Sequence, residues 1–158
     1  MTTSAGCLIC DENARLGSPP PREHLASDQH WRVAHAFGTG LRGWLVLVPL
    51  RHVTAIAELT DAEAAGLGQW QVRLSRALHA ATGCAKTYVA QFAEAEGFSH
   101  VHFHIVPRMR DLATELRGPK VFALLNQPDG RALSESQRDE IAADIRRYLE
   151  SPGTMSTP

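Results

Sequence analysis

Three histidines alternate with apolar residues in the run His100-Val101-His102-Phe103-His104-Ile105-Val106. Strict alternation is typical of a β-strand with one buried face. It predicts that Val101, Phe103 and Ile105 point into a core and that the three imidazoles share the opposite face. Because a neutral imidazole can act as a nucleophile, proton carrier or metal ligand near neutral pH, this face is the first candidate for a functional site.

A single metal ion does not easily bind all three of these histidines. Along a strand the first and third lie roughly 13 Å apart at Cα, whereas zinc ligands lie roughly 2 Å from the ion. The geometry favours divided roles along a groove, in which one imidazole attacks or shuttles protons and its neighbours hold charge or a metal. The alternative is a half-exposed strand with no site, and three histidines in register disfavour it.

Cys7 and Cys10 form a second motif, Cys-x-x-Cys, near the N-terminus. A two-residue spacer lets both thiolates reach one zinc ion from a single turn, although two coordination positions are then still to be filled. A redox-active pair is the other interpretation of this spacing. It is disfavoured because no strand precedes the pair to place it in a βαβ unit. Cys84 has no cysteine at metal-binding spacing and is interpreted as a small buried residue.

Several strands are expected to position these residues. The run from Gly43 to Pro49 is aliphatic and ends at proline, which predicts a central strand, and His52 follows just beyond its end. Residues 23–27 and 31–37 are predicted as two shorter strands, followed by a glycine-marked turn at residues 38–40. Residues 86–92 regain strand character and are expected to pair antiparallel with the histidine strand, because only residues 93–99 intervene.

Two helices are expected around this sheet. Thr60 and Glu63 form a capping box that starts a long helix, and Gly83 is placed to end it. Gly66 and Gly68 weaken that helix locally and are candidates for close packing. A second helix is predicted after Ser134, while the chain from Arg108 to Gly118-Pro119 is expected to be irregular. Residues 1–150 are therefore predicted to form one domain of the α+β class, and residues 151–158 a disordered tail.

Composition restricts the partners of the protein. The 158 residues carry a formal net charge of −1, so no global positive field recruits nucleic acid or an anionic membrane. No apolar run approaches the roughly 18 residues of a membrane span, and the N-terminus lacks a basic region followed by an apolar core. The expected location is the cytoplasm.

The sequence HVHFHIVPR resembles the histidine triad signature of the HIT superfamily of nucleotide hydrolases and transferases. The resemblance runs from about Cys7 to Arg108. It implies an α+β fold with a mainly antiparallel sheet of about five strands, a long helix after the central strand and a C-terminal helix. It also implies a homodimer that binds a small-molecule nucleotide.

The resemblance further implies a role for each residue of the triad. His102 would attack the α-phosphate of the nucleotide and form a nucleotidyl-histidine intermediate. His104 would contact the α-phosphate or the leaving side, and His100 would support His102 or bind a metal. Histidine at the third triad position is typical of the hydrolase branches, so the expected substrates are dinucleoside polyphosphates or nucleoside phosphoramidates.

Zinc-bearing branches of the superfamily imply a ligand set for a structural ion, namely Cys7, Cys10, His52 and His100. A closed shell of four protein ligands leaves no position for an activated water. By the same resemblance, Gln91, Gly97 and Ser99 are candidate contacts to the phosphate oxygens, although Glu94 and Glu96 would repel phosphate if they faced it. The alternative function is a nucleotide-binding or zinc-organised interaction protein with little or no catalysis.

Overall fold

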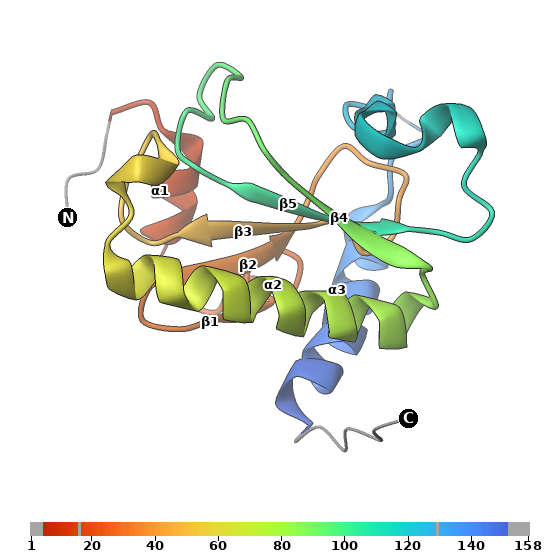
Figure 1. Ribbon diagram of the computed structural model, residues 1–158, viewed down its shortest axis with the longest axis horizontal. Helices are drawn as coiled ribbons and strands as arrows, with labels where there is room; N and C mark the ends of the chain where they lie inside the picture. The colour runs from red at the N-terminus through yellow and green to blue at the C-terminus, as the bar shows by residue number, and fades with distance from the viewer. Residues whose placement is uncertain (1–4, 16, 129, 152–158) are drawn as a thin grey trace.

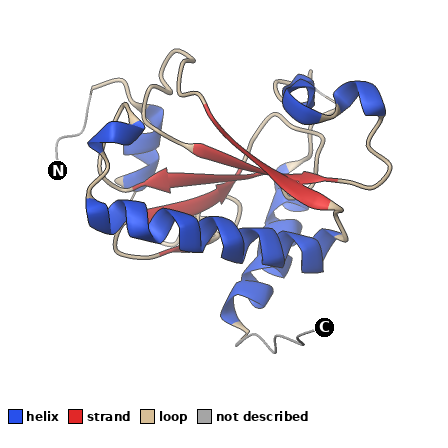
Figure 2. Ribbon diagram, viewed as in Figure 1, coloured by secondary structure: helices blue, strands red, loops and turns tan. Residues whose placement is uncertain are grey.

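The computed structural model describes residues 5–15, 17–128 and 130–151, so most of the expected tail lies outside the described residues. Within these ranges a five-stranded, wholly antiparallel sheet runs through the molecule in the order β1-β2-β3-β5-β4 (Figures 1 and 2). Its strands are β1 (Ala26–Ser27), β2 (Trp31–His35), β3 (Leu45–Pro49), β4 (Lys86–Gln91) and β5 (Phe103–Arg108). The α-helices are α1 (Leu8–Asn13), α2 (Asp61–Thr82) and α3 (Glu135–Glu150). This architecture confirms the expected α+β class.

The two faces of the sheet have different coverings. Helices α2 and α3 lie against one face, and the main core between them includes Leu47 and Ile105 from the strands and Leu74 and Ile145 from the helices. Short helix α1 and the 3-10 helices that follow β5 lie at opposite ends of the view in Figure 1. Because side chains alternate along a strand, Val46 and His104 point to the face opposite the main core. That face carries the candidate site.

Helix α2 begins and ends where the sequence predicts. The Thr60 hydroxyl accepts a hydrogen bond from the Glu63 amide at 3.2 Å, and the Glu63 carboxylate accepts one from the Thr60 amide at 2.8 Å. Gly83 ends the helix in the left-handed region at φ +69°, which glycine adopts without steric cost. The two helix glycines differ, because a Cβ at Gly66 would lie 3.1 Å from the Trp31 indole nitrogen whereas a Cβ at Gly68 would meet nothing within 4 Å.

The histidine strand is shorter than predicted at its start. The ladder ends at Phe103, which pairs with Leu47 of β3 and Gln91 of β4, so residues 100–102 lie outside it. The Val101 amide instead donates to the Val53 carbonyl at 2.8 Å. Val101, Phe103 and Ile105 are nonetheless buried in the main core, as predicted. The departure leaves the His100 carbonyl outside the strand pairing and available to a side chain.

Three further segments differ from the sequence predictions. The strand expected at 23–27 is reduced to Ala26–Ser27, because the Pro20 carbonyl accepts from the Glu23 and His24 amides in a turn. The strand expected at 31–37 ends at His35. The segment after β5, predicted to be irregular, contains the 3-10 helices η2 (Thr114–Leu116) and η3 (Gly118–Leu124), and a third, η1 (Ile56–Glu58), precedes α2. None of the helices within the described ranges is long and apolar enough to cross a bilayer.

Candidate active site and metal centre

The imidazole of His102 is fixed in one tautomer by the backbone. Its Nδ1 lies 2.8 Å from the His100 carbonyl oxygen. A carbonyl oxygen can only accept a hydrogen bond, so Nδ1 carries a proton, and in the neutral ring the lone pair is on Nε2. The side chain is half-buried and lines a cavity. His102 therefore lines that cavity with a ring whose neutral form has its lone pair on Nε2.

His104 is fixed in the opposite tautomer, by an indole that donates to it. The indole nitrogen of Trp44 lies 3.1 Å from Nδ1 of His104. An indole N–H can only donate, so Nδ1 accepts and the neutral ring carries its proton on Nε2. Burial, together with the neighbouring His102, lowers the pKa of His104 to about 4. His104 is consequently a neutral hydrogen-bond donor, with its ring centroid 5.0 Å from that of His102.

Aromatic rings pack around His104. The Phe122 ring, from η3, lies 5.0 Å from the His104 ring and 5.3 Å from the Trp44 ring, both edge-on. Phe92, just after β4, contacts Phe122 at 5.2 Å. These rings exclude water from one side of the imidazole and stabilise its neutral form.

Four side chains from distant parts of the chain cluster as a possible metal site: Cys7, Cys10, His52 and His100. Their ligand atoms all lie within 4.8 Å of one another. Nδ1 of His100 is 3.7 Å from Sγ of Cys7 and 3.5 Å from Sγ of Cys10, and Nδ1 of His52 is 3.2 Å from Sγ of Cys10. A tetrahedral zinc shell places neighbouring ligand atoms roughly 3.3 to 3.8 Å apart, so the spacing fits such an ion.

The backbone around this cluster orients the imidazole of His100. Its Nε2 lies 2.9 Å from the Pro49 carbonyl and donates to it, which leaves Nδ1 directed at the two thiols. Metal-binding histidines are commonly oriented in this way through their second nitrogen. Two thiolates and two neutral imidazoles suit zinc, and a closed shell of four makes the site structural. The set expected from the resemblance is thus assembled in space.

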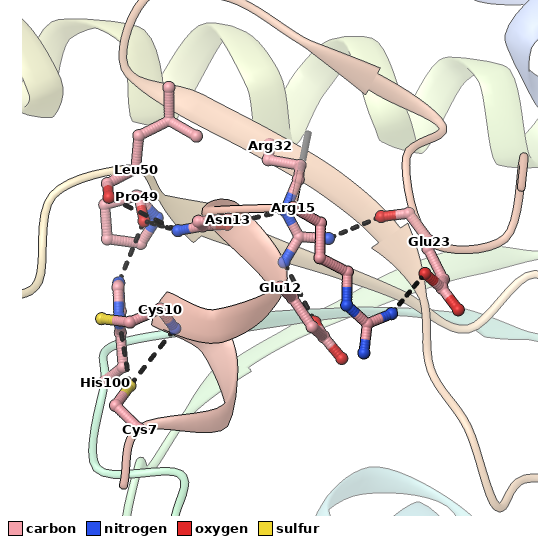
Figure 3. A network of polar contacts seen from close by, with 10 residues as sticks. All are labelled: Cys7, Cys10, Glu12, Asn13, Arg15, Glu23, Arg32, Pro49, Leu50 and His100. Carbon is pink, nitrogen blue, oxygen red and sulfur yellow. Dashed lines mark hydrogen bonds and ion pairs between the residues drawn. The ribbon is translucent and has the colours of Figure 1, made fainter. Parts of the chain in front are cut away.

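A polar network holds α1 beside this cluster (Figure 3). The Asn13 amide donates to the Pro49 carbonyl at 3.1 Å, and its oxygen accepts from Arg32 Nε at 2.7 Å. Arg32 also donates to the Glu23 carbonyl and pairs with Glu12 at 3.1 Å. The Pro49 carbonyl therefore accepts hydrogen bonds from both His100 and Asn13. These bonds link the metal-ligand cluster to the packing of α1.

A cavity of about 350 Å³ lies on the histidine face of the sheet. This volume is near the lower end of small-molecule sites, which run from roughly 300 to 1,000 Å³. Its apolar lining includes Ala34 of β2, Ala36 just after that strand and Val46 of β3, and His102 and Phe98 also line it. Its remaining wall carries charged residues from α1, the loop before β1 and α3. The cavity thus combines an apolar lining, the imidazole of His102 and a charged wall.

The three predicted phosphate contacts lie elsewhere among the described residues. Gln91 ends edge strand β4 opposite Phe103, Ser99 is exposed, and neither lines the cavity. Gly97 has a structural role, since its carbonyl accepts from the Leu8 amide and a Cβ there would lie 3.3 Å from the Leu8 side chain. Glu94 and Glu96 are exposed and do not line the cavity, so the repulsion considered from sequence does not arise in this geometry.

Sequence reasoning missed Trp44, Phe122 and Arg138. Trp44 had a usable signal, since it shares the period-two register of Val46 and Val48, which places it on the histidine face. Phe122 and Arg138 lie 18 and more residues beyond the triad and reach the site through tertiary packing. No local sequence pattern predicts that packing.

The fold is that of the histidine triad proteins. No protein-family model matches the sequence, and no curated protein sequence matches it. Solved structures do match, and many of them are histidine triad proteins. A zinc-bound histidine triad family protein from Mycobacterium smegmatis is 20% identical, with a TM-score of 0.64 over 90% of this chain and 92% of that one. A histidine triad protein from Bradyrhizobium japonicum is 24% identical, with a TM-score of 0.65 over 80% of this chain and 89% of that one.

A third similar structure is a hypothetical histidine triad nucleotide-binding protein from Sulfolobus tokodaii. It is 15% identical, with a TM-score of 0.62 over 80% of this chain and 82% of that one. At these identities the similarity establishes the arrangement of the elements.

Proposed function

We propose that this protein is a nucleotidyl hydrolase that cleaves at the α-phosphate of a dinucleoside polyphosphate or a nucleoside phosphoramidate. One observation carries the proposal: the His100 carbonyl accepts a hydrogen bond from Nδ1 of His102, whose side chain lines the cavity. In the neutral ring the lone pair is therefore on Nε2. A positioned imidazole of this kind is a competent nucleophile toward phosphorus. The Sulfolobus tokodaii protein, described as nucleotide-binding, has the same fold.

In the first step, Nε2 of His102 forms a bond to the α-phosphorus and the bond to the leaving group breaks. A polyphosphate leaves as its own anion, whereas an amine takes a proton from water. In the second step, water adds to phosphorus, the P–N bond breaks, its electrons return to Nε2, and the proton of the water passes to solvent. The products are a nucleoside monophosphate and the leaving group.

His104 acts as a hydrogen-bond donor in this proposal. Its Nε2–H is fixed by Trp44 and its ring is neutral, so it is suited to stabilise charge on a phosphate oxygen. A neutral imidazole is a poor acid, and proton transfer to the leaving group is therefore assigned to water. The role of the His100 side chain is to bind the metal, and its carbonyl supports His102.

Zinc at the four-ligand site would stabilise the local fold. When bound, it would hold Cys7 and Cys10 of the α1 turn against His52 and His100. Ile9, between the two cysteines, lines the cavity. The ligands of this site therefore position one wall of the proposed nucleotide pocket as well as the start of the triad.

Substitution of the nucleophile tests the proposal. His102→Ala should abolish release of nucleoside monophosphate from adenosine and guanosine dinucleoside polyphosphates and phosphoramidates, measured by chromatography. The wild-type protein, quenched early, should carry a nucleotidyl group on His102 detectable by mass spectrometry. His30→Ala, outside the cavity, is the matched control. Equal turnover by His102→Ala with an unchanged circular dichroism spectrum would refute the mechanism.

A second candidate is nucleotide binding with little turnover. It is favoured by the cavity lining, which within the described part of the chain contains no serine or threonine to contact a phosphate. This candidate predicts that nucleoside monophosphates bind to wild-type protein and to His102→Ala alike, while no substrate of the panel is cleaved. The same assays separate the two functions.

A further inference from the structure

Arg138 differs from the other arginines of the cavity wall. Arg22 pairs with Asp139 at 2.7 Å and with Glu135 at 2.9 Å, and Arg32 pairs with Glu12. For Arg138, no side-chain hydrogen bond or ion pair is found within residues 5–15, 17–128 and 130–151, and its Nε is buried without a partner. A half-buried guanidinium with unmet donors is costly, and a ligand in the cavity can meet them.

Contacts between the C-terminal segment and the β2–β3 loop explain how Arg138 reaches the cavity. The Gln127 amide donates to the Gly38 carbonyl at 2.8 Å, and the Leu133 amide donates to the Thr39 carbonyl at 2.9 Å. The start of α3 is then fixed by the Asp139 carboxylate, which accepts from the Arg22 backbone amide at 3.0 Å. Arg138 is therefore held at the charged wall by two separate sets of contacts.

The shape of the cavity orients a nucleotide. The reacting phosphate must lie at Nε2 of His102, and the Phe98 ring lies 6.4 Å from the His102 ring. The Phe37 ring follows at 5.9 Å from Phe98, and the small side chains of Ala34 and Ala36 line the same cavity. A cavity lined by both aromatic rings and small residues suits a flat base. A nucleotide with its phosphate at His102 consequently directs its base toward the wall that contains Arg138.

The charges around Arg138 select the kind of group it can bind. Arg22 adds positive charge beside Arg138, and the carboxylates of Glu135, Asp139 and Glu23 offset it, although none of the three is within ion-pair distance of Arg138. The three carboxylates outnumber the guanidinium groups of Arg22 and Arg138, so a second phosphate or a carboxylate would add to a local excess of negative charge and be repelled. A neutral group with two acceptors on one edge would satisfy the guanidinium without that repulsion.

We propose that Arg138 recognises the O6 and N7 edge of a 6-oxopurine, so that the cavity prefers guanine or hypoxanthine nucleotides over adenine nucleotides. The inference rests on the proposed function and names its substrate class. The guanidinium is a planar fork that only donates, and the O6 and N7 atoms of guanine both accept. Adenine presents an amino donor in place of O6, so one donor of Arg138 would face another donor.

Equilibrium binding of GMP, IMP and AMP to the full-length protein tests the inference. GMP and IMP should bind roughly tenfold or more tightly than AMP, as expected for one bidentate contact. Arg138→Ala should lose that preference by weakening GMP and IMP while leaving AMP nearly unchanged. Arg138→Lys keeps the charge but not the fork, so it should also lose most of the preference.

Arg147→Ala is the matched control, because Arg147 lies on the same helix, pairs with Asp144 and does not line the cavity. It should retain the wild-type order of affinities. Equal binding of GMP and AMP by wild-type protein would overturn the inference while leaving the nucleotide proposal intact. An equal loss of all three ligands in both Arg138 variants would also overturn it. Failure of all three to bind wild-type protein would refute the inference and the proposed function together.

Discussion

The Trp44 indole nitrogen donates to Nδ1 of His104 at 3.1 Å, and the two rings meet edge to face with centroids 5.9 Å apart. Both side chains are buried. This bond determines which nitrogen of His104 carries the proton and makes the imidazole a donor at Nε2. Trp44 is thus a positioning residue for the proposed site, acting through His104.

Trp44→Phe should change the tautomer of His104. The substitution keeps an aromatic ring but removes the indole donor to Nδ1, so the Nδ1-protonated tautomer becomes populated. Nitrogen-15 shifts of the His104 ring measure this change without reference to activity. Turnover should fall by roughly 10- to 100-fold, somewhat less than for complete removal of a transition-state donor.

Trp70→Phe provides the control for this measurement. The Trp70 indole also donates, to the Asp28 carboxylate at 2.6 Å, but away from the cavity lining. The control should lose stability while His104 keeps its wild-type shifts. An unchanged His104 spectrum in Trp44→Phe would show that the tautomer is determined by something other than the indole.

The metal centre predicts that substitutions of Cys10 and Cys84 differ in their effect on bound zinc. Cys10→Ala should reduce bound zinc from about one ion per chain to near zero and lower the thermal midpoint, because the ion stabilises only the folded ligand set. Cys84→Ala should keep its zinc, since Cys84 lies in the main core, away from the cluster. Metal analysis of protein purified under reducing conditions checks both. Equal zinc in the two variants would contradict the assignment.

Local patterns predicted much of this fold. The alternation around His102 placed Val101, Phe103 and Ile105 in the core, and the capping box of Thr60 and Glu63 located the start of α2. These features depend on residues close in sequence, whose periodicity or hydrogen bonding is set locally. Contacts between residues far apart in the sequence, such as the metal ligands Cys7 and His100, could be predicted only from the resemblance to the histidine triad family.

The features that sequence reasoning did not predict depend on tertiary packing. The α1 helix is six residues long, too short to be stable alone, and is held by Asn13 and Arg32 contacts to other segments. The β5 strand starts late because the Val101 amide bonds to Val53 instead of a neighbouring strand. The single-domain boundary, the homodimer and the cytoplasmic location stay predictions.

The Glu63 carboxylate links stability to pH. Hydrogen bonds from Arg51, at 3.1 and 2.8 Å, lower the pKa of Glu63 from 4.5 to about 2, and the Thr60 amide adds to the effect. Because the folded pKa lies below the unfolded value, the stabilisation is fully present above about pH 5 and is lost as the pH falls toward 2.

Glu63→Gln tests this linkage. At pH 7 it should reduce the free energy of unfolding by about 1 to 2 kcal/mol, less than the full pKa difference suggests because Arg51 is half-exposed to solvent. Urea titrations at pH 7, 5 and 3 should show this difference shrinking at the lowest pH. Glu94→Gln, in the exposed loop before the triad, is the control. A difference that stays constant with pH would contradict the linkage.

The two glycines of α2 should respond oppositely to alanine. At Gly68 the added Cβ meets nothing within 4 Å, so Gly68→Ala should raise the free energy of unfolding by about 0.5 to 1 kcal/mol through helix propensity. At Gly66 the Cβ would lie 3.1 Å from the Trp31 indole nitrogen, which donates to the Glu63 carbonyl at 3.1 Å.

Gly66→Ala must therefore displace Trp31, a fully buried ring, or strain its hydrogen bond. We expect this cost, about 1 to 3 kcal/mol for an overpacked site, to exceed the gain in propensity. Denaturant titrations of both variants measure the difference, and each serves as the control for the other because they lie two residues apart on one helix. Equal stabilisation by both would show that α2 can move away from β2 without loss, and the contact between Gly66 and Trp31 would then not limit the packing of the sheet.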